Sequence, residues 1–247
     1  MTDIAERVGL HKSTTHRLLA TLERRRFVER RPGTGLYRLG LQVARLVHVT
    51  LDHDELFHLA VPYLRRLSEE SEENVHFAVL DGTSVVYVHV VEGQRRVKLA
   101  ATQGQSLPAH ATASGKAILA FLPEAELRAV LGHGMPRYTP RTIQSVEAFI
   151  EDARRARDRG YAVSERELEN DITALAAPVL DADSRPLASV SIAGPAYRMT
   201  EQRIRKLAPR LLSAVHELSL ELQKTAPARA ALSRRPTSAA GRPAQAR

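Results

Sequence analysis

The sequence predicts an α+β fold built from two parts, and three observations indicate this class. The first forty residues carry two short helical patterns followed by a hairpin pattern. The longer remainder runs in the order helix, strands, helices, strands, helix, which is typical of a central antiparallel sheet flanked by helices. Charge is also divided unevenly along the chain, so the two parts are expected to do different work.

Two helices joined by a tight turn are predicted at the start of the chain. Asp3 to Glu6 has the form of a capping box, and Gly9 ends the first helix. A second helix begins at about Ser13 and runs to about Arg26. Its inner face is expected to consist of Thr15, Leu18, Leu19 and Leu22. Its first turns expose side chains that reach phosphates and base edges when such a helix enters a major groove, namely Lys12, Ser13, Thr14, His16 and Arg17.

A β-hairpin pattern follows these helices. Residues 27–31 and 36–39 read as two basic strands, and the turn Pro32-Gly33-Thr34-Gly35 separates them. Residues 1–45 contain ten Lys and Arg against four Asp and Glu. Helix, glycine turn, basic helix and basic hairpin in this order are typical of a winged helix-turn-helix, so residues 1–40 are interpreted as a module that binds double-stranded DNA.

The N-terminal module is predicted to be incomplete. A winged helix-turn-helix needs a further helix before Thr2 to cover the apolar faces of the other two, and this sequence begins too late to contain it. We therefore expect a truncated or miscalled start. Without that helix Ile4, Val8, Leu18 and Leu22 lose part of their core, which is expected to weaken the module and its DNA affinity.

The larger part is predicted from alternating strand patterns and helical patterns. A linker helix is expected over residues 41–54, and a helix from Asp54 to Ser71 contains Pro62, which implies a start or a kink. A hairpin of strands turns at Asp81-Gly82-Thr83. The remaining expected elements are strands at 95–101, 172–180 and 187–193 and helices at 112–121, 124–131, 145–159 and 200–223. Residues 224–247, with Ala, Pro, Arg and Ser and no apolar period, are expected to form a disordered basic tail.

Composition excludes several classes of protein. The chain has 247 residues, of which 43% are apolar and 26% charged, and no run approaches the roughly 18 apolar residues of a membrane span. It has no Cys, which excludes disulfides and thiolate chemistry, and the N-terminus lacks the form of a signal peptide. We expect a cytoplasmic protein with no membrane partner.

No catalytic or metal-binding pattern stands out. His48, His53 and His58 stand five residues apart, which does not place them on one helical face as metal ligands. The acidic run from Glu165 to Asp171 is interpreted as a solvated loop. Ser114-Gly115-Lys116 lacks the first glycine and the final Ser or Thr of a phosphate loop. We therefore expect no enzyme activity, no catalytic residue, no metal and no cofactor, although a helix beginning at 112–114 is able to receive a small anion.

Four motifs in this order resemble the IclR family of bacterial transcriptional regulators. They are GLHKSTTHRLLATLERRRFVER with PGTGLYRLG, then LPAHATASGKAILA, then RGYAVSERE, then VSIAGP. The resemblance covers residues 2–223. It implies a GAF-like effector-binding and oligomerisation domain over residues 55–223 and a homodimer or dimer of dimers on a palindromic operator.

The resemblance also implies the functional residues. DNA contacts fall on Lys12, Ser13, Thr14, His16 and Arg17, with wing contacts from Arg30 and Arg31. The effector pocket is implied at Leu99, Leu107, Ala113, Ser114, Ser164, Ala174, Ser191 and Ala193. Ser164 stands where members often have Asp or Glu, and methyl groups stand at 174 and 193 where some members have polar side chains.

The function expected from the resemblance is that of a ligand-responsive regulator, with repressors among its kind. The effector is expected to be a small organic or aromatic acid that changes operator affinity. The alternative is an effector-sensing module that no longer binds DNA because its N-terminus is truncated.

Overall fold

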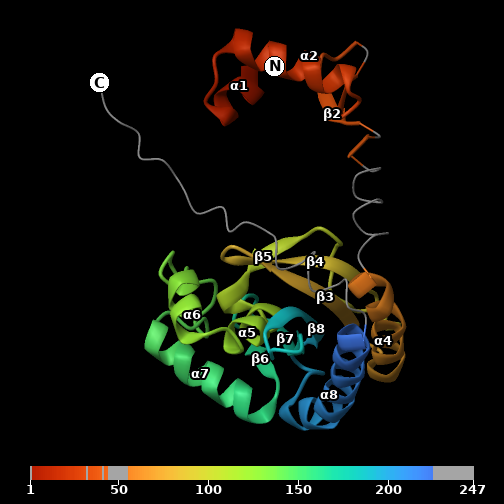
Figure 1. Cartoon of the computed structure of the whole chain (residues 1–247), viewed down its shortest axis with the longest axis vertical. Helices are drawn as coiled ribbons and strands as arrows, with labels where there is room; N and C mark the ends of the chain where they lie inside the picture. Colours follow the sequence, from red (N-terminus) through yellow and green to blue (C-terminus); the bar gives the residue numbers. More distant parts are fainter. Residues whose placement is uncertain (1, 32, 41, 44–54, 225–247) are drawn as a thin grey trace. The chain divides into compact units, whose positions relative to one another are not determined.

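The computed structural model describes residues 2–31, 33–40, 42–43 and 55–224, and the chain divides into two compact units, 1–55 and 56–247 (Figure 1). The predicted linker helix lies almost wholly outside the described residues, as does the predicted disordered tail apart from Lys224, which ends a helix. Within the described residues no helix is long and apolar enough to cross a membrane. The predicted α+β class is confirmed.

The first unit consists of two helices and a two-stranded hairpin. Its elements are α1 (Thr2–Val8), α2 (Lys12–Arg24), β1 (Val28–Arg30) and β2 (Tyr37–Leu39). Gly9 adopts a φ of +65° in the turn between the helices, a conformation that favours glycine. The strands pair antiparallel with Glu29 opposite Arg38. The helix-turn-helix and hairpin therefore lie where the sequence predicts them.

The inner face of α2 is narrower than the sequence predicts. Thr15 and Leu19 are buried, as expected, but Leu18 and Leu22 are 49% and 40% exposed. Val8 of α1 is also exposed. The predicted apolar stripe is correct in spacing, but only its centre is covered in this unit because the unit has few elements to pack against it.

The second unit has a six-stranded antiparallel sheet in the order β5-β4-β3-β8-β7-β6. Its strands are β3 (Asn74–Asp81), β4 (Ser84–Val91), β5 (Ser106–Pro108), β6 (Ala162–Glu165), β7 (Ile172–Leu180) and β8 (Pro186–Pro195). Its helices are α4 (Glu55–Ser71), η1 (Ala109–Ala111), α5 (Ala113–Ala120), α6 (Glu124–Leu131), α7 (Val146–Arg159) and α8 (Glu201–Lys224). Pro62 lies inside α4 and does not begin it.

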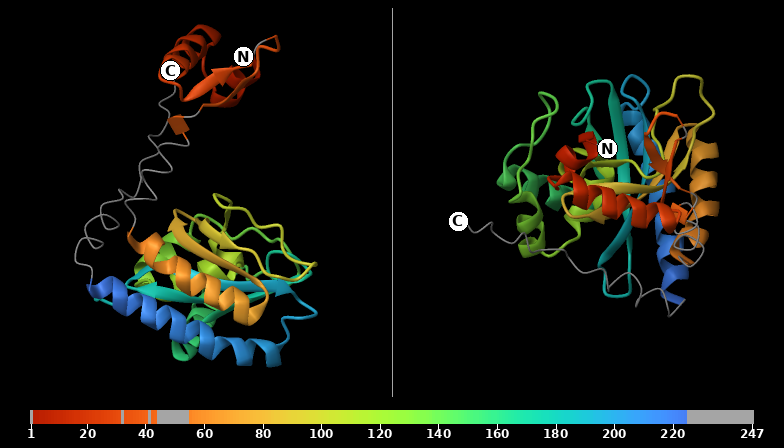
Figure 2. Two further views of the ribbon diagram at one scale, coloured as in Figure 1. Left: turned by 90° about the vertical axis from the view of Figure 1, so that its right-hand side faces the viewer. Right: turned by 90° about the horizontal axis from the view of Figure 1, so that it is seen from above.

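Helices cover both faces of this sheet (Figures 1 and 2). Helices α4 and α8 lie side by side on one face, where Leu64 and Leu211 pack against Phe77 and Ile192. Helices α5, α6 and α7 pack in a second core that contains Ile118 and residues of β3, β4, β6 and β7. Because side chains alternate along a strand, neighbouring residues of β7 and β8 serve opposite faces.

Two expectations for this unit are wrong. Residues 95–101 do not form a strand, and the third strand of that half of the sheet is β5, which pairs with β4. The segment 92–105 is instead held by side chains: Asn74 Nδ2 donates to the Leu99 carbonyl at 3.0 Å, and Arg198 donates to the Val97 carbonyl at 2.7 Å. The acidic run from Glu165 to Asp171, interpreted from the sequence as a solvated loop, begins at the last residue of the edge strand β6, and its Glu167 is buried.

Candidate functional site

The first unit exposes the predicted basic surface on α2. Lys12, Ser13, His16 and Arg17 are exposed and Thr14 is half-buried, because burial of Thr15 and Leu19 turns these residues outward. The Ser13 hydroxyl lies 2.9 Å from His11 Nδ1. Within the described residues, the side chains of Lys12 and Arg17 make no hydrogen bond or ion pair to the protein. They are therefore available to an external partner.

The hairpin adds cations to this unit. Arg30 and Arg31 are exposed, and within the described part of the chain their side chains make no hydrogen bond or ion pair. Arg38, in contrast, is paired with Glu29 on the neighbouring strand at 2.6 Å. The unpaired arginines of this hairpin are thus the two that the sequence predicts as wing contacts.

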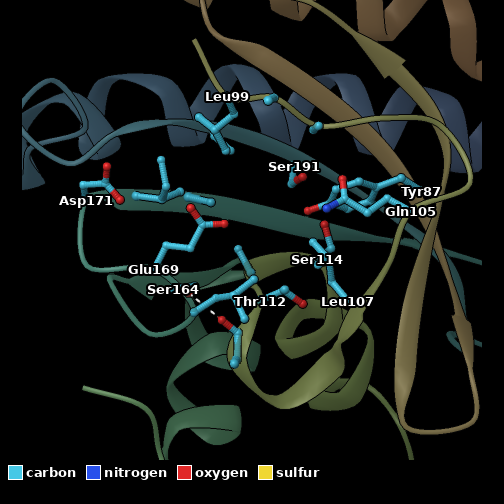
Figure 3. A pocket seen from close by; sticks show the side chains of 18 of the residues that line it. Tyr87, Leu99, Gln105, Leu107, Thr112, Ser114, Ser164, Glu169, Asp171 and Ser191 are labelled. Carbon is cyan, nitrogen blue, oxygen red and sulfur yellow. Dashed lines mark hydrogen bonds between the residues drawn. The ribbon is translucent and has the colours of Figure 1, made fainter. Parts of the chain in front are cut away.

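The second unit contains a cavity of about 310 Å³ between the sheet and the start of α5 (Figure 3). The structure brings all eight predicted effector residues together at this cavity: Leu99, Leu107, Ala113, Ser114, Ser164, Ala174, Ser191 and Ala193. It also adds residues that are not among these eight: Tyr87, Lys98, Ala100, Ala101, Gln105, Ala111, Thr112, Leu168, Glu169, Asp171 and Ile172.

The start of α5 forms the floor of the cavity. The Thr112 hydroxyl caps the helix by accepting from the Gly115 N–H at 3.2 Å. Ser164 Oγ donates to the Ala111 carbonyl at 2.9 Å and ties β6 to this floor. The Ser114 residue is only 1% exposed, yet its Oγ has no hydrogen-bond partner within the described residues. A buried hydroxyl without a partner at a helix start is suited to binding a ligand oxygen.

Gly115 permits the close approach of α5 to η1. A Cβ at this position would lie 2.2 Å from the carbonyl oxygen of Ala109, far inside van der Waals contact. The first turn of α5 therefore packs directly against η1 because Gly115 has no side chain. This contact fixes the first turn of α5, which carries Ser114, against the cavity.

A buried histidine supports the sheet side of the cavity. His76 Nδ1 lies 3.2 Å from Ser191 Oγ, and its ring stacks on Tyr87 with a centroid distance of 4.5 Å. Burial lowers the pKa of His76 to about 4. Burial, together with the charge of Glu169, raises the pKa of Tyr87 to about 12. Both rings are therefore neutral near pH 7.

Lys116 of the Ser-Gly-Lys sequence binds groups inside the protein and is not free to bind a phosphate. It is buried, and its Nζ contacts the Val163 carbonyl at 2.7 Å, Asp152 at 2.8 Å and Glu167 at 2.5 Å. Burial raises the pKa of Glu167 in spite of this ammonium. For Asp152 burial acts in the same direction, but Lys116 and Arg155 outweigh it and lower the pKa. The cluster holds α5, α7 and the loop after β6 together.

The additional pocket residues have only weak signals in the sequence. Thr112 precedes a helical pattern and has the residue type of an N-cap, which marks the helix start. Tyr87 and Gln105 reach the cavity through strand pairing and loop folding, which no local pattern encodes. Within the residues that the structure describes, no group of three His, Asp or Glu could hold a metal ion.

A helix-turn-helix unit followed by a domain with a ligand-sized cavity defines the class of transcriptional regulators. Residues 1–32 match the IclR helix-turn-helix domain, and residues 48–220 match the bacterial transcriptional regulator IclR C-terminal domain. The chain therefore belongs to the IclR family of transcriptional regulators.

Individual relatives agree with this assignment. The chain is 34% identical over 223 residues to the HTH-type transcriptional regulator XynR of Escherichia coli K12, covering 90% of this chain and 88% of that one. It is 33% identical to the transcriptional repressor IclR of the same strain, covering 89% and 81%. A crystal structure of an IclR transcriptional regulator from Alicyclobacillus acidocaldarius is similar with a TM-score of 0.81 and 28% identity, covering 89% and 88%.

Proposed function

We propose that this protein is a cytoplasmic, ligand-responsive regulator that binds a palindromic DNA operator and changes its operator affinity when a small organic acid occupies the cavity. The observation that carries the proposal is the buried, unpartnered Ser114 hydroxyl at the start of α5 in a ligand-sized cavity. The family and its named repressors support the regulatory role.

Contacts to DNA are assigned to the exposed cations of the first unit. Arg17 and its neighbours Lys12, Ser13, Thr14 and His16 on α2 are placed to reach base edges and phosphates. Arg30 and Arg31 lie on the hairpin, where a wing contacts the DNA backbone. The absence of internal ion pairs to Arg17, Arg30 and Arg31 within the described residues supports their role.

Effector binding is proposed to act through a homodimer or a dimer of dimers. Two recognition helices must match the spacing of two half-sites, so a ligand that favours one arrangement of the subunits changes operator affinity. The alternative is an effector-sensing module that does not bind DNA. The exposed Val8, Leu18 and Leu22 favour this alternative, because apolar surface left uncovered weakens a small module.

DNA binding is tested by fluorescence anisotropy with DNA from the region upstream of the gene, over a salt series. Arg17→Ala should lose sequence-specific affinity, whereas Arg30→Ala should weaken binding to all sequences and flatten the salt slope by about one unit. Arg154→Ala, which removes an exposed arginine of α7, is the control and should change neither quantity. Binding no tighter than to unrelated DNA would favour the sensing-module alternative.

The cavity is tested by filling it. Ser191→Leu should abolish the effector response while operator binding stays intact, because its side chain enters the cavity from β8. Ser213→Leu on the exposed side of α8 is the matched control. A normal response in Ser191→Leu would move the effector site elsewhere.

A further inference from the structure

The cavity carries more negative than positive charge. The charged residues that line it are Lys98, Glu169 and Asp171. The Lys98 ammonium already forms an ion pair with Glu92. Within the described residues, the side chains of Glu169 and Asp171 form no hydrogen bond and no ion pair. Two carboxylates at the cavity are therefore left without a countercharge.

These carboxylates lie on a loop that the surrounding structure fixes in place. The loop joins β6 to β7, and its backbone is held where the Ala196 N–H donates to the Asp171 carbonyl at 2.7 Å and the Ile172 N–H to the Glu169 carbonyl at 3.4 Å. Thr142 Oγ1 donates to the Glu167 carbonyl at 2.6 Å. The side chains of Glu169 and Asp171 are exposed at the mouth of the cavity, on a backbone that is already ordered.

The two sides of the cavity have opposite preferences for charge. In the view of Figure 3 the carboxylates of Glu169 and Asp171 lie on one side, and the side chains of Ser114, Ser191 and Gln105 lie on the other. The start of α5 carries the positive end of the helix dipole and the unpartnered Ser114 hydroxyl, which together suit an anion. The carboxylate side suits a cation.

We propose that the effector is a small zwitterion of the amino acid type, with its carboxylate at the start of α5 and its ammonium at Glu169 and Asp171. This inference rests on the proposed function and narrows the class of acid that the cavity takes. An acid without a positive group would approach two uncompensated negative charges, and its binding would be opposed by their repulsion. An ammonium group turns that repulsion into attraction and donates hydrogen bonds to both carboxylates.

The charge preference is tested by isothermal titration calorimetry with matched probes. The probes are the standard L-amino acids and the ω-amino acids with two to six carbons, each beside the hydroxy acid and the unsubstituted acid with the same skeleton. At least one amino acid should bind about tenfold or more tightly than both of its counterparts, the factor expected for a charge-assisted hydrogen bond. The proposal is overturned if the counterparts bind as tightly as the amino acids or more tightly. It is also overturned if no amino acid binds at a concentration 10-fold above a Kd of ~1 mM.

Variants assign the preference to the two carboxylates. Glu169→Gln with Asp171→Asn should weaken binding of the preferred amino acid by about 5- to 50-fold. The same double variant should bind the hydroxy counterpart more tightly than wild type does, because the two repelling charges are gone. Glu165→Gln is the matched control, because Glu165 is an exposed carboxylate on β6 that pairs with Arg141 and does not line the cavity. Unchanged amino acid binding in the double variant overturns the assignment.

Measuring operator affinity with the same samples separates this inference from the proposed function. If an amino acid binds as described without changing operator affinity, the zwitterion site stands and the regulatory role fails. If an acid without an ammonium group binds best and changes operator affinity, the regulatory role stands and this inference is wrong.

Discussion

Replacing the buried His76 should change how the stability of the second unit depends on pH. His76 is fully buried behind the cavity, and its pKa of about 4 lies below the ordinary value of 6.5 for histidine. The unfolded chain therefore binds a proton at this residue in a pH range where the folded protein does not. Stability from the neutral ring is complete above pH 6.5 and is lost as the pH falls from 6.5 towards 4.

The size of this effect follows from the two pKa values. They differ by about 2.5 pH units, and each unit corresponds to about 1.4 kcal/mol, so His76 accounts for about 3 kcal/mol of stability lost on acidification. Glutamine has a similar length, retains an amide that hydrogen-bonds to the Ser191 hydroxyl, and does not titrate. His76→Gln should therefore remove this part of the pH dependence.

The assay is urea unfolding at half-unit intervals from about pH 4 to pH 8 for wild type, His76→Gln and the control His133→Gln, which alters an exposed histidine. His89, whose pKa burial and Arg65 lower, and Glu167, whose pKa burial raises, titrate in all three proteins. The difference between wild type and His76→Gln therefore isolates His76. A difference that stays constant within about 0.5 kcal/mol across the range would refute the reasoning.

Three further substitutions test other parts of the second unit. Arg198→Ala should lower the free energy of unfolding, measured with urea, by about 3–5 kcal/mol, because the Glu73 carboxylate is only 2% exposed and loses its partner. Adding Glu73→Gln should recover part of this loss, and a loss below about 1 kcal/mol contradicts the prediction. Gly115→Ala should cost about 1–3 kcal/mol because the new methyl group meets the Ala109 carbonyl, and an unchanged melting temperature would show that η1 gives way. Thr112→Ala should lower the free energy of unfolding by about 1 kcal/mol because the helix cap is lost, whereas Thr112→Ser retains the capping hydroxyl. Equal melting temperatures of the two variants would show that the cap does not stabilise the protein.

Strong periodic patterns predicted most of the fold. The helix-turn-helix, the hairpin at Gly82 and the long C-terminal helix each follow from local spacing, since their signals lie within one element. The strand expected at 95–101 does not form, because the Asn74 and Arg198 side chains bind carbonyls of that segment from distant parts of the chain. Long-range hydrogen bonds of this kind leave no local pattern.

Part of the lining of the candidate cavity could be predicted from the sequence, but the charge of the cavity could not. Resemblance indicated eight residues that the structure brings to one cavity, and alternation along β8 explains why Ser191 and Ala193 both reach it. The acidic run around Glu169 was interpreted as solvated, because composition alone does not reveal that the loop returns to the cavity mouth. Tyr87 and His76 depended on strand register, which the sequence does not specify.

The alternation of β7 and β8 has a consequence for how such a receptor evolves. On β8, Ile192 packs beneath α4 and α8 while its neighbours Ser191 and Ala193 line the cavity. On β7, Leu175 lies in the same core as Ile192, and Ala174 lines the cavity. Alternating residues of the same strands thus line the cavity or pack in the core. Exchange of one set leaves the other intact, so a lineage is free to acquire a new chemical signal without rebuilding the scaffold that senses it.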